Sequence, residues 1–409
     1  MKYDEILSFL RSKNSSRYSL ENLEDFFAVS RFHYSVPTIH VTATNGKGSI
    51  VNYISNIYID AGYKVGTFIS PQRQLTQMIL VNGVGITTQE IERVFNIFFD
   101  DFVRFDLTEF EIQTVIALYF ISQNNADIAV IEVGMGGAND ATNVIESTAL
   151  AVIGKVGLEH SRYLGRSETE IANSKAGIIK FGIPTLTVHQ DEAIERAIRE
   201  VAKKQKSSLL FSPILGEITQ VSGSLLFDGC GYKNLEVNSR ALYQVENASI
   251  SIEAVKILNG RFPVTESNIR NGLRSKTLAG RFTVLNKFPR IIIDGAHNPD
   301  GVQTLLRTLN INRISPKEAL FSSFLDKNID KMLAYLGAEI PTITLTTFNN
   351  DRARGADDYF LFADEYHFVA DFSEILAEYM VSSDDNSILL VCGSLDFAYE
   401  VIEYLEARD

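Results

Sequence analysis

The chain has 409 residues, more than a single hydrophobic core usually supports, so we expect two domains. A hydrophobic fraction of 45% and a charged fraction of 22% are those of an ordinary globular protein and exclude extensive disorder. A formal net charge of −13 argues against binding to nucleic acid or to anionic membranes, because phosphate groups select basic surfaces.

Strand-like runs alternate with helical patterns in the first half of the chain. A helix is expected from Ser49 to the stop at Gly62, and another begins at TEFE, where Thr108 and Glu111 form a capping box. This alternation predicts an α/β protein whose sheet is largely parallel. The predicted strands are 37–43, 63–70, 126–134, 150–156 and 184–188.

The pattern changes twice further along the chain. Short β runs at 207–212, 217–222 and 223–229 predict an antiparallel excursion that is not a domain of its own. Alternation restarts at Arg290, and Pro289 makes a linker at 286–290 plausible. The predicted domains are therefore residues 1–286 and 290–409. The later strands are expected at 290–296, 319–324, 342–348 and 387–394, with helices from Gly301, near 328–336 and at the end.

The compartment is suggested by the cysteines and the N-terminus. Cys230 and Cys392 lie far apart, outside any metal-binding spacing, which fits a reducing compartment. The N-terminus scatters charges among its apolar residues, and no stretch of about 18 uncharged apolar residues follows. We expect a cytoplasmic protein with no membrane partner.

The segment 39–50, IHVTATNGKGSI, has the features of a phosphate-binding loop. A strict P-loop requires glycine where this chain has Val41, so the textual motif fails. The physical requirements survive, because a strand leads through small residues and two glycines into a helix. Lys47 can reach the β- and γ-phosphates, and the Ser49 hydroxyl can meet Mg²⁺. The residues alone leave open a glycine turn that happens to contain a lysine.

Beyond this loop, the chain resembles the folylpolyglutamate synthase and dihydrofolate synthase family, a branch of the Mur-type ATP-dependent amide ligases. The family typically shows GTNGKGS at the loop, and the similarity runs nearly from end to end. It implies an N-terminal P-loop-type ATPase domain and a smaller, Rossmann-like C-terminal α/β domain. The matching segments are SPQRQ (70–74), TEFE (108–111), EVGMGGANDATN (132–143), GLEHSRYLG (157–165), SKAGIIK (174–180), ENA (246–248), AGRF (279–282), DGAHNPDG (294–301) and CGSLDFAYEV (392–401).

The resemblance implies a role for each matching residue. The ATP-binding residues would be Asn45, Gly46, Lys47, Gly48, Ser49, Asn247 at the adenine, Arg281 and Asp294. Two Mg²⁺ ions would be held by Ser49, Ser70, Glu132 and His160. The pterin substrate would be contacted by Thr108, Glu109, Phe110, Glu111, Asn139, Asp140 and Ala141. The catalytic residues would be Lys47, His160 and Lys175, with Lys175 carbamylated into an anionic group.

Each assignment has a plainer structural alternative. Glu132 could be an acidic residue at a solvent-exposed strand end, although a buried carboxylate would need a partner or a metal. Lys175 would by default be a surface lysine on a helix, and a lone histidine such as His160 is usually structural. Arg281 and Asp294 could be a surface charge and a turn carboxylate.

The implied reaction is ATP-dependent amide formation. ATP phosphorylates the acceptor carboxylate, and the α-amine of L-glutamate attacks the resulting acyl phosphate. The acceptor would be folate, with dihydropteroate as a further acceptor, and closure of the second domain would exclude water. A potassium requirement and a monomeric state are further expectations.

Five positions depart from the family's usual residues: Ala43, Gln72, Ala138, Lys155 and Ser174. They leave the identity of the acceptor more open than the ligase chemistry. Two alternatives therefore stand beside the folate ligase. One is a related ligase for a different carboxylate or amine, and the other is a non-catalytic nucleotide-binding protein.

Overall fold

The computed structural model describes residues 1–13, 20–30, 32–70, 74–157, 165, 167–213, 216–221, 223–285, 289–384 and 386–408. The chain forms two compact units. The first comprises Met1–Ile218, Leu226–Val237 and Glu246–Ser275, and the second comprises Thr219–Leu225, Asn238–Val245 and Lys276–Asp409. The predicted domain limits, 1–286 and 290–409, stay a prediction. None of the helices in the described ranges combines the length and the apolar character that a membrane crossing requires.

The first unit is built on an eight-stranded sheet in the order β4-β3-β2-β5-β1-β6-β7-β8. Its six parallel strands are β1 (Thr38–Thr42), β2 (Val65–Phe68), β5 (Ile128–Glu132), β6 (Thr148–Ile153), β7 (Thr185–Thr187) and β8 (Leu209–Phe211). The antiparallel edge consists of β3 (Ile79–Val81) and β4 (Val84–Gly85). The predicted, largely parallel α/β sheet is confirmed. One assignment was wrong: the run 207–212 contains the parallel edge strand β8 and does not belong to the antiparallel excursion.

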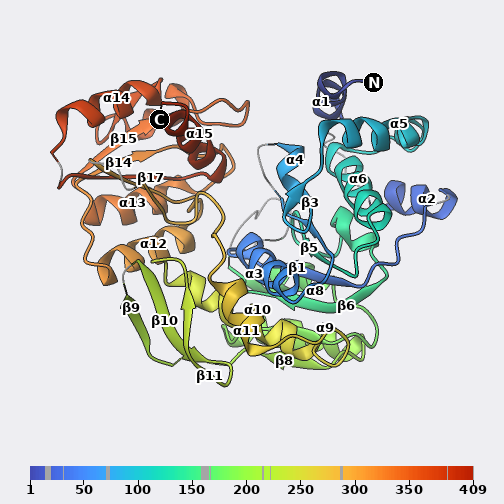
Figure 1. Ribbon diagram of the computed structural model, residues 1–409. Helices are drawn as coiled ribbons and strands as arrows, with labels where there is room; N and C mark the ends of the chain where they lie inside the picture. Colours follow the sequence, from blue (N-terminus) through green and yellow to red (C-terminus); the bar gives the residue numbers. More distant parts are fainter. Residues whose placement is uncertain are drawn as a thin grey trace. The chain divides into compact units, whose positions relative to one another are not determined.

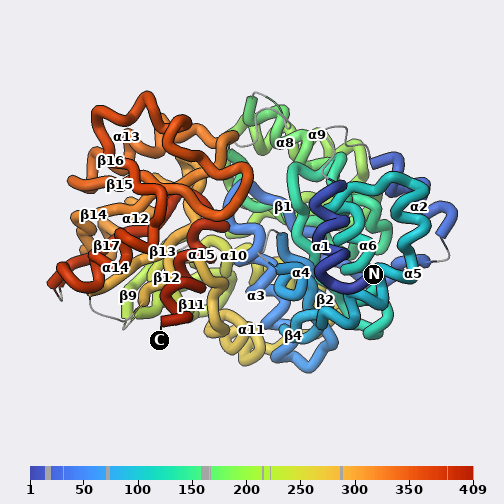
Figure 2. The backbone as a smooth tube through the Cα atoms, turned by 90° about the horizontal axis from the view of Figure 1, so that it is seen from above, coloured from blue at the N-terminus to red at the C-terminus, as the bar shows by residue number. Residues whose placement is uncertain are grey.

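Helices surround this sheet (Figures 1 and 2). One core joins β2 and β5 to α1 (Tyr3–Ser12), α2 (Glu21–Val29), α5 (Thr88–Arg104) and α6 (Glu109–Gln123). A second core joins β6 to α8 (Glu168–Ala176) and α9 (Glu192–Lys204). Contacts of α3 (Lys47–Asp60) with β1, β2 and β5 place it against the centre of the sheet, and α11 (Glu266–Leu273) packs on α3. The remaining elements are α4 (Leu75–Met78), the 3₁₀ turn η1 (Ala141–Val144) and α10 (Tyr243–Ile257).

The helix predicted from Ser49 begins at Lys47, two residues earlier and within the phosphate-binding segment 39–50. Gly46, with φ +89°, makes the left-handed turn immediately before the helix, so Lys47 and Gly48 already belong to its first turn. The capping box at the start of α6 is confirmed. The backbone N–H and the hydroxyl of Thr108 donate to Oε2 of Glu111 at 2.7 and 2.8 Å.

A three-stranded sheet in the order β11-β10-β9 follows the first half of the chain. Its strands are β9 (Ile218–Val221), β10 (Ser224–Gly229) and β11 (Tyr232–Val237). The runs predicted at 217–222 and 223–229 are its first two strands, and the third strand was not predicted.

The second unit holds a six-stranded sheet in the order β12-β13-β17-β14-β15-β16. Its strands alternate between two cores: Ile292 and Leu390 pack towards α12 and α13, whereas Ile291 and Leu389 pack towards α14 and α15. Helices on both faces explain why these strands are continuous apolar runs and confirm the predicted α/β unit. The elements are β12 (Thr283–Leu285), which is antiparallel to its neighbour, β13 (Arg290–Ile293), α12 (Pro299–Ile311), β14 (Glu318–Phe321), α13 (Ile329–Glu339), β15 (Thr342–Thr346), η2 (Ala356–Phe362), β16 (His367–Val369), α14 (Phe372–Ser382), β17 (Ile388–Cys392) and α15 (Leu395–Glu406).

Candidate active site

The turn of the phosphate-binding segment, residues 43–46, connects β1 to α3 and is held from two sides. A Cβ on Gly46 would lie 2.3 Å from Oδ1 of Asn247, which projects from α10. Because φ is also positive here, another residue would be strained and would displace the Asn247 side chain. On the other side, the backbone N–H of Thr44 donates to the carbonyl of Lys155 at 2.8 Å, and the hydroxyl of Thr44 donates to the carbonyl of Gly157 at 3.1 Å. The fold therefore brings Asn247, the residue expected at adenine, against the loop expected at the phosphates.

Two lysines converge on one carbonyl of this segment. Nζ of Lys47 donates to the carbonyl oxygen of Ala43 at 3.0 Å, and Nζ of Lys175 donates to the same oxygen at 2.9 Å. Lys175 lies on α8 and is only 1% exposed, so the default expectation of a surface lysine is wrong. A buried ammonium requires partners, and this carbonyl is one of them.

Close backbone packing explains how Lys175 reaches the loop. A Cβ on Gly137 would lie 2.7 Å from the carbonyl oxygens of both Ser174 and Lys175, and a Cβ on Gly177 would lie 2.4 Å from Cα of Ala138. The segment after β5 thus rests directly on the last turn of α8, and the backbone N–H of Ala138 donates to the carbonyl of Ser174 at 2.8 Å. Glycines on both sides permit this approach.

Two of the predicted metal ligands, Ser70 and Glu132, lie at the carboxyl ends of the adjacent parallel strands β2 and β5, where ligands of open α/β sheets are usually found. Glu132 ends β5 and is 3% exposed, so it is not at a solvent-exposed strand end. The backbone N–H of Ser70, just after β2, donates to Oε2 of Glu132 at 3.3 Å. The Ser49 hydroxyl, in the first turn of α3, is buried and has no hydrogen-bond partner among the described residues.

These groups suit a hard cation. A carboxylate and hydroxyl oxygens are the donors that Mg²⁺ prefers, and the unpaired Ser49 hydroxyl has lone pairs to offer. The described residues contain no cluster of three or more His, Cys, Asp or Glu side chains with metal-binding geometry. His160, the remaining predicted ligand, lies outside the described residues, so its place is a prediction.

The two predicted substrate segments meet at Gly134. A Cβ there would lie 2.6 Å from the ring of Phe110 and 3.1 Å from Oδ2 of Asp140. The Phe110 ring stacks on Phe68, with ring centroids 5.9 Å apart. The fold therefore joins the start of α6 to the loop after β5, and Asn139 of that loop is exposed to solvent.

The carboxylates of these segments are held in place by hydrogen bonds. Oδ2 of Asp140 accepts the backbone N–H of Met135 at 2.7 Å, and Oδ1 accepts the N–H of Thr142 at 3.0 Å together with its hydroxyl. Burial raises the pKa of Asp140, which these hydrogen bonds partly oppose. Burial also raises the pKa of Glu109 and of Glu111, whose Oε1 has no partner among the described residues.

In the second unit, Asp294 follows β13 and organises its surroundings. Oδ2 accepts the hydroxyl of Tyr243 at 2.6 Å and the N–H of Phe282 at 2.9 Å, and Oδ1 accepts the N–H of Ala296 at 2.9 Å. Burial raises the pKa of Asp294, while the Tyr243 hydrogen bond and the charge of Arg281 oppose that rise. Nε of Arg281 is buried without a hydrogen-bond partner in the described ranges.

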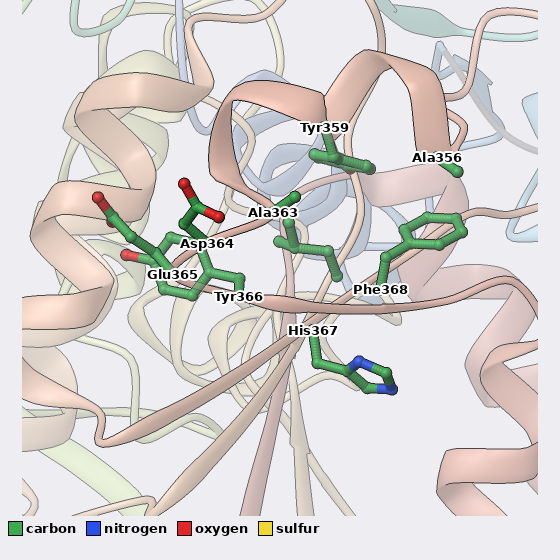
Figure 3. A pocket seen from close by; sticks show the side chains of 9 residues that line it. Ala356, Tyr359, Ala363, Asp364, Glu365, Tyr366, His367 and Phe368 are labelled. Carbon is green, nitrogen blue, oxygen red and sulfur yellow. The ribbon is translucent and has the colours of Figure 1, made fainter.

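A cavity of about 340 Å³ lies elsewhere in the second unit (Figure 3). Figure 3 shows the carboxylates of Asp364 and Glu365 on one side and the rings of Tyr359 and Phe368 on the other. None of the predicted site residues lines it, so it is separate from the candidate active site.

Comparison with known proteins decides the family. The description "Mur ligase middle domain" matches residues 41–255, and "Mur ligase, glutamate ligase domain" matches residues 280–395. The dihydrofolate synthase/folylpolyglutamate synthase of Bacillus subtilis is 31% identical over 392 residues, which cover 91% of each chain. This chain belongs to the folylpolyglutamate synthase and dihydrofolate synthase family.

Solved structures of the family have the same fold. The Escherichia coli enzyme in complex with DHPP and ADP has a TM-score of 0.90 at 26% identity, covering 100% of this chain and 98% of that one. An FPGS in complex with AMPPCP and folate has a TM-score of 0.84 at 27% identity, covering 99% of this chain and 100% of that one.

Some residues of this family member's site carry no sequence motif. Tyr243 was not predicted, and its link to Asp294 spans 51 positions in sequence. The carbonyl of Ala43 could not have been predicted as a shared lysine acceptor either, because any residue supplies a carbonyl. One pattern that the sequence did offer is the alternation of polar residues in the buried strand β1.

Proposed function

We propose that this chain is an ATP-dependent ligase that joins L-glutamate to folate through an acyl-phosphate intermediate. A free carboxylate does not form an amide usefully in water, because oxide is a poor leaving group. Transfer of the γ-phosphoryl group of ATP to the carboxylate oxygen forms a P–O bond and releases ADP. The α-amine of L-glutamate then attacks the carbonyl carbon, loses a proton, and phosphate departs as the C–O bond breaks.

The observation that carries this proposal is similarity, over 91% of the chain, to a relative named for both activities. In addition, the phosphate-binding segment, Glu132 and Lys175 lie in one region of the first unit. Lys47 and the N-terminus of α3 would bind the phosphates of ATP, with Asn247 at the adenine. Ser49, Ser70, Glu132 and His160 would hold Mg²⁺, which when bound neutralises charge on the phosphate and acceptor oxygens. The roles of Arg281 and Asp294 towards the nucleotide stay predictions, as does a potassium requirement.

Carbamylation of Lys175 is part of the proposal. The uncharged amine adds to CO₂ and loses a proton, which gives an anionic carbamate with oxygen donors for a metal. The carbamate keeps one N–H, so it can still donate to the Ala43 carbonyl that Lys175 contacts now. The burial of Lys175 supports the modification, because a charged ammonium is costly to bury and a metal-bound anion would have a partner.

The acceptor is selected by residues other than those expected at the phosphates of ATP. The Escherichia coli relative was solved with DHPP, and another relative with folate, so dihydropteroate is the second acceptor to consider. Phe110, stacked on Phe68 and lying against Gly134, offers an aromatic face suited to a flat pterin ring. The enzyme is expected to be cytoplasmic and monomeric.

Glutamate-dependent ADP release by the purified protein tests the proposal. Tetrahydrofolate, dihydropteroate and no acceptor form the three arms, each with and without L-glutamate. Release with tetrahydrofolate supports the synthase, and release with both acceptors supports a bifunctional enzyme. If the protein binds ATP but releases no ADP with either acceptor, the result would favour a different acceptor or a non-catalytic nucleotide-binding protein.

A further inference from the structure

Strand β1 carries three polar side chains on one face, although it lies in the middle of a buried parallel sheet. Thr38, His40 and Thr42 alternate along the strand and are each 0% exposed. Alternate residues of a strand share a face, and central parallel strands are usually apolar throughout. Buried polar groups are costly unless they are hydrogen-bonded, so the partners of these three residues indicate what they do.

Thr42 and His40 both bond to the loop that follows β5. Oγ1 of Thr42 donates to the carbonyl oxygen of Gly136 at 2.7 Å. Nε2 of His40 lies 2.7 Å from Oγ1 of Thr142. Because the Thr142 hydroxyl donates its only proton to Asp140, its oxygen must accept from His40, which therefore carries its proton on Nε2.

His40 serves as a fixed donor and not as a titrating group. Burial, with a contribution from the charge of Lys180, lowers the pKa of His40 to about 3. The ring is thus neutral at physiological pH and keeps its Nε2–H towards Thr142. Nδ1 of His40 is buried and has no partner among the described residues.

These bonds hold both ends of one segment. Residues 134–142, called the acceptor loop below, include Asn139, Asp140 and Ala141, the positions expected at the pterin. Thr42 fixes the start of the loop at Gly136, and His40 fixes its end at Thr142. The same strand forms the first part of the phosphate-binding segment, 39–50, and leads into the turn before α3. One strand therefore connects the acceptor loop to the turn expected at the phosphates of ATP.

We propose that Thr42 and His40 are positioning residues that fix the acceptor loop relative to the phosphate-binding segment. They would thereby set the distance between the acceptor carboxylate and the γ-phosphate. This inference rests on the proposed function. It predicts that loss of these bonds lowers kcat/KM for the acceptor more than it changes the KM for ATP.

The test compares paired variants. Thr42→Val keeps the side-chain shape and removes the donor, and Thr42→Ser keeps the hydroxyl. His40→Leu removes the Nε2 donor, and His40→Gln keeps an amide donor at the matching distance. Thr142→Val removes the acceptor of the His40 bond, and with it the hydroxyl bond to Asp140, from the loop side, which leaves the sheet untouched if a β1 variant fails to fold. Thr38→Val is the matched control, because this buried hydroxyl on the same strand and face bonds to Val36 and Tyr34, away from the acceptor loop.

Two readouts are needed, and the first is kinetic. Thr42→Val, His40→Leu and Thr142→Val are expected to lower kcat/KM for the folate acceptor about 5- to 10-fold, with the KM for ATP changed less than twofold. Thr42→Ser and His40→Gln should restore most of the loss, and Thr38→Val should show none. Equal losses towards ATP and folate, or a loss of the same size in Thr38→Val, would overturn the proposal.

The second readout is hydrogen–deuterium exchange of peptides that span residues 134–142, which needs no activity. Faster exchange in Thr42→Val and Thr142→Val, and not in Thr38→Val, supports the positioning role. Unchanged exchange overturns it. If the wild-type protein releases no ADP with any folate while loop exchange still rises, the proposed function fails and the structural coupling stands.

Discussion

The carbonyl oxygen of Ala43 lies 2.9 Å from Nζ of Lys175, although the two residues are 132 positions apart in the sequence. This bond joins the phosphate-binding segment to α8 and holds a buried cation beside the expected triphosphate site. The same oxygen accepts from Lys47 at 3.0 Å, so the electrostatics of the loop depend on the state of both lysines.

The first prediction concerns the chemical state of Lys175. Lys175→Ala should lose at least 100-fold in ligase activity, and added acetate or formate should restore part of it by supplying the missing carboxylate. Lys175→Arg keeps a cation but cannot form the carbamate, so it should be inactive and should not respond to acetate. Steady-state ADP release measures the ligase activity of the wild type and of both variants. An active Lys175→Arg variant would contradict the carbamate.

The second prediction concerns Gly46. Gly46→Ala should weaken ATP binding more than tenfold, because its Cβ would lie 2.3 Å from Oδ1 of Asn247. Alanine at a positive φ also adds backbone strain of about 1–2 kcal/mol, and the effect of this strain has to be distinguished from the effect of the clash. Gly62→Ala is the matched control, since Gly62 has φ +87° and open space around its Cβ position. Calorimetric titration with ADP should find the control unchanged, and equal losses in both variants would rule out the clash as the cause.

The third prediction is a pH dependence of stability. Burial raises the pKa of Glu111 above its ordinary value of 4.5, so the folded state binds this proton more tightly than the unfolded state does. The stability that the group contributes is therefore fully present below pH 4.5 and is lost as pH rises through the folded pKa. Glu111→Gln cannot titrate and should escape this loss.

Urea unfolding of both proteins from pH 4 to pH 8 measures the difference directly. The free energy of unfolding of Glu111→Gln relative to wild type should rise with pH across this window. The contributions of the other titrating groups are the same in both proteins and cancel in the difference. The cost of altering the capping box is independent of pH and does not change the slope. A difference that is flat or falls with pH would contradict the assigned direction.

The fourth prediction concerns the metal site. Glu132→Gln should raise the Mg²⁺ concentration needed for half-maximal activity at least tenfold, because an amide is a weaker ligand for a hard cation than a carboxylate. Unchanged thermal unfolding would show that the backbone contact with Ser70 survives. A variant with ordinary Mg²⁺ dependence would remove Glu132 from the metal ligands.

The sequence predicts the parts of the fold that depend on local pattern. Strands such as Ile128–Glu132 follow from apolar runs, and the capping box at Thr108 follows from residue types three positions apart. The burial of Lys175 could not be predicted in this way, because it depends on the packing of Gly137 against α8. The strand β8 was misassigned for the same reason: its short run pairs with β7, and pairing partners are not written in local pattern.

In the candidate site, too, features set by local pattern could be predicted, and features that depend on long-range contacts could not. The strand, turn and helix of residues 39–50 could be predicted despite the missing glycine, because strand, small residues and helix follow one another directly, and their phosphate-binding role stays a prediction. Tyr243 was not recognisable, since a single tyrosine becomes informative only once its hydroxyl is seen at Asp294. His40 and Thr42 are visible in the sequence as polar residues among apolar ones. Their role can be inferred only from the structure, which shows their bonds to the acceptor loop.

The most direct test of the ligase mechanism follows the oxygen atoms. Folate labelled with ¹⁸O in its terminal carboxylate is incubated with the enzyme, ATP and L-glutamate, and the released phosphate is analysed by mass spectrometry. An acyl phosphate predicts that one ¹⁸O atom enters the phosphate for each amide bond formed. Product formation with unlabelled phosphate would contradict the mechanism, because it would mean that no bond ever joined the acceptor carboxylate to phosphorus.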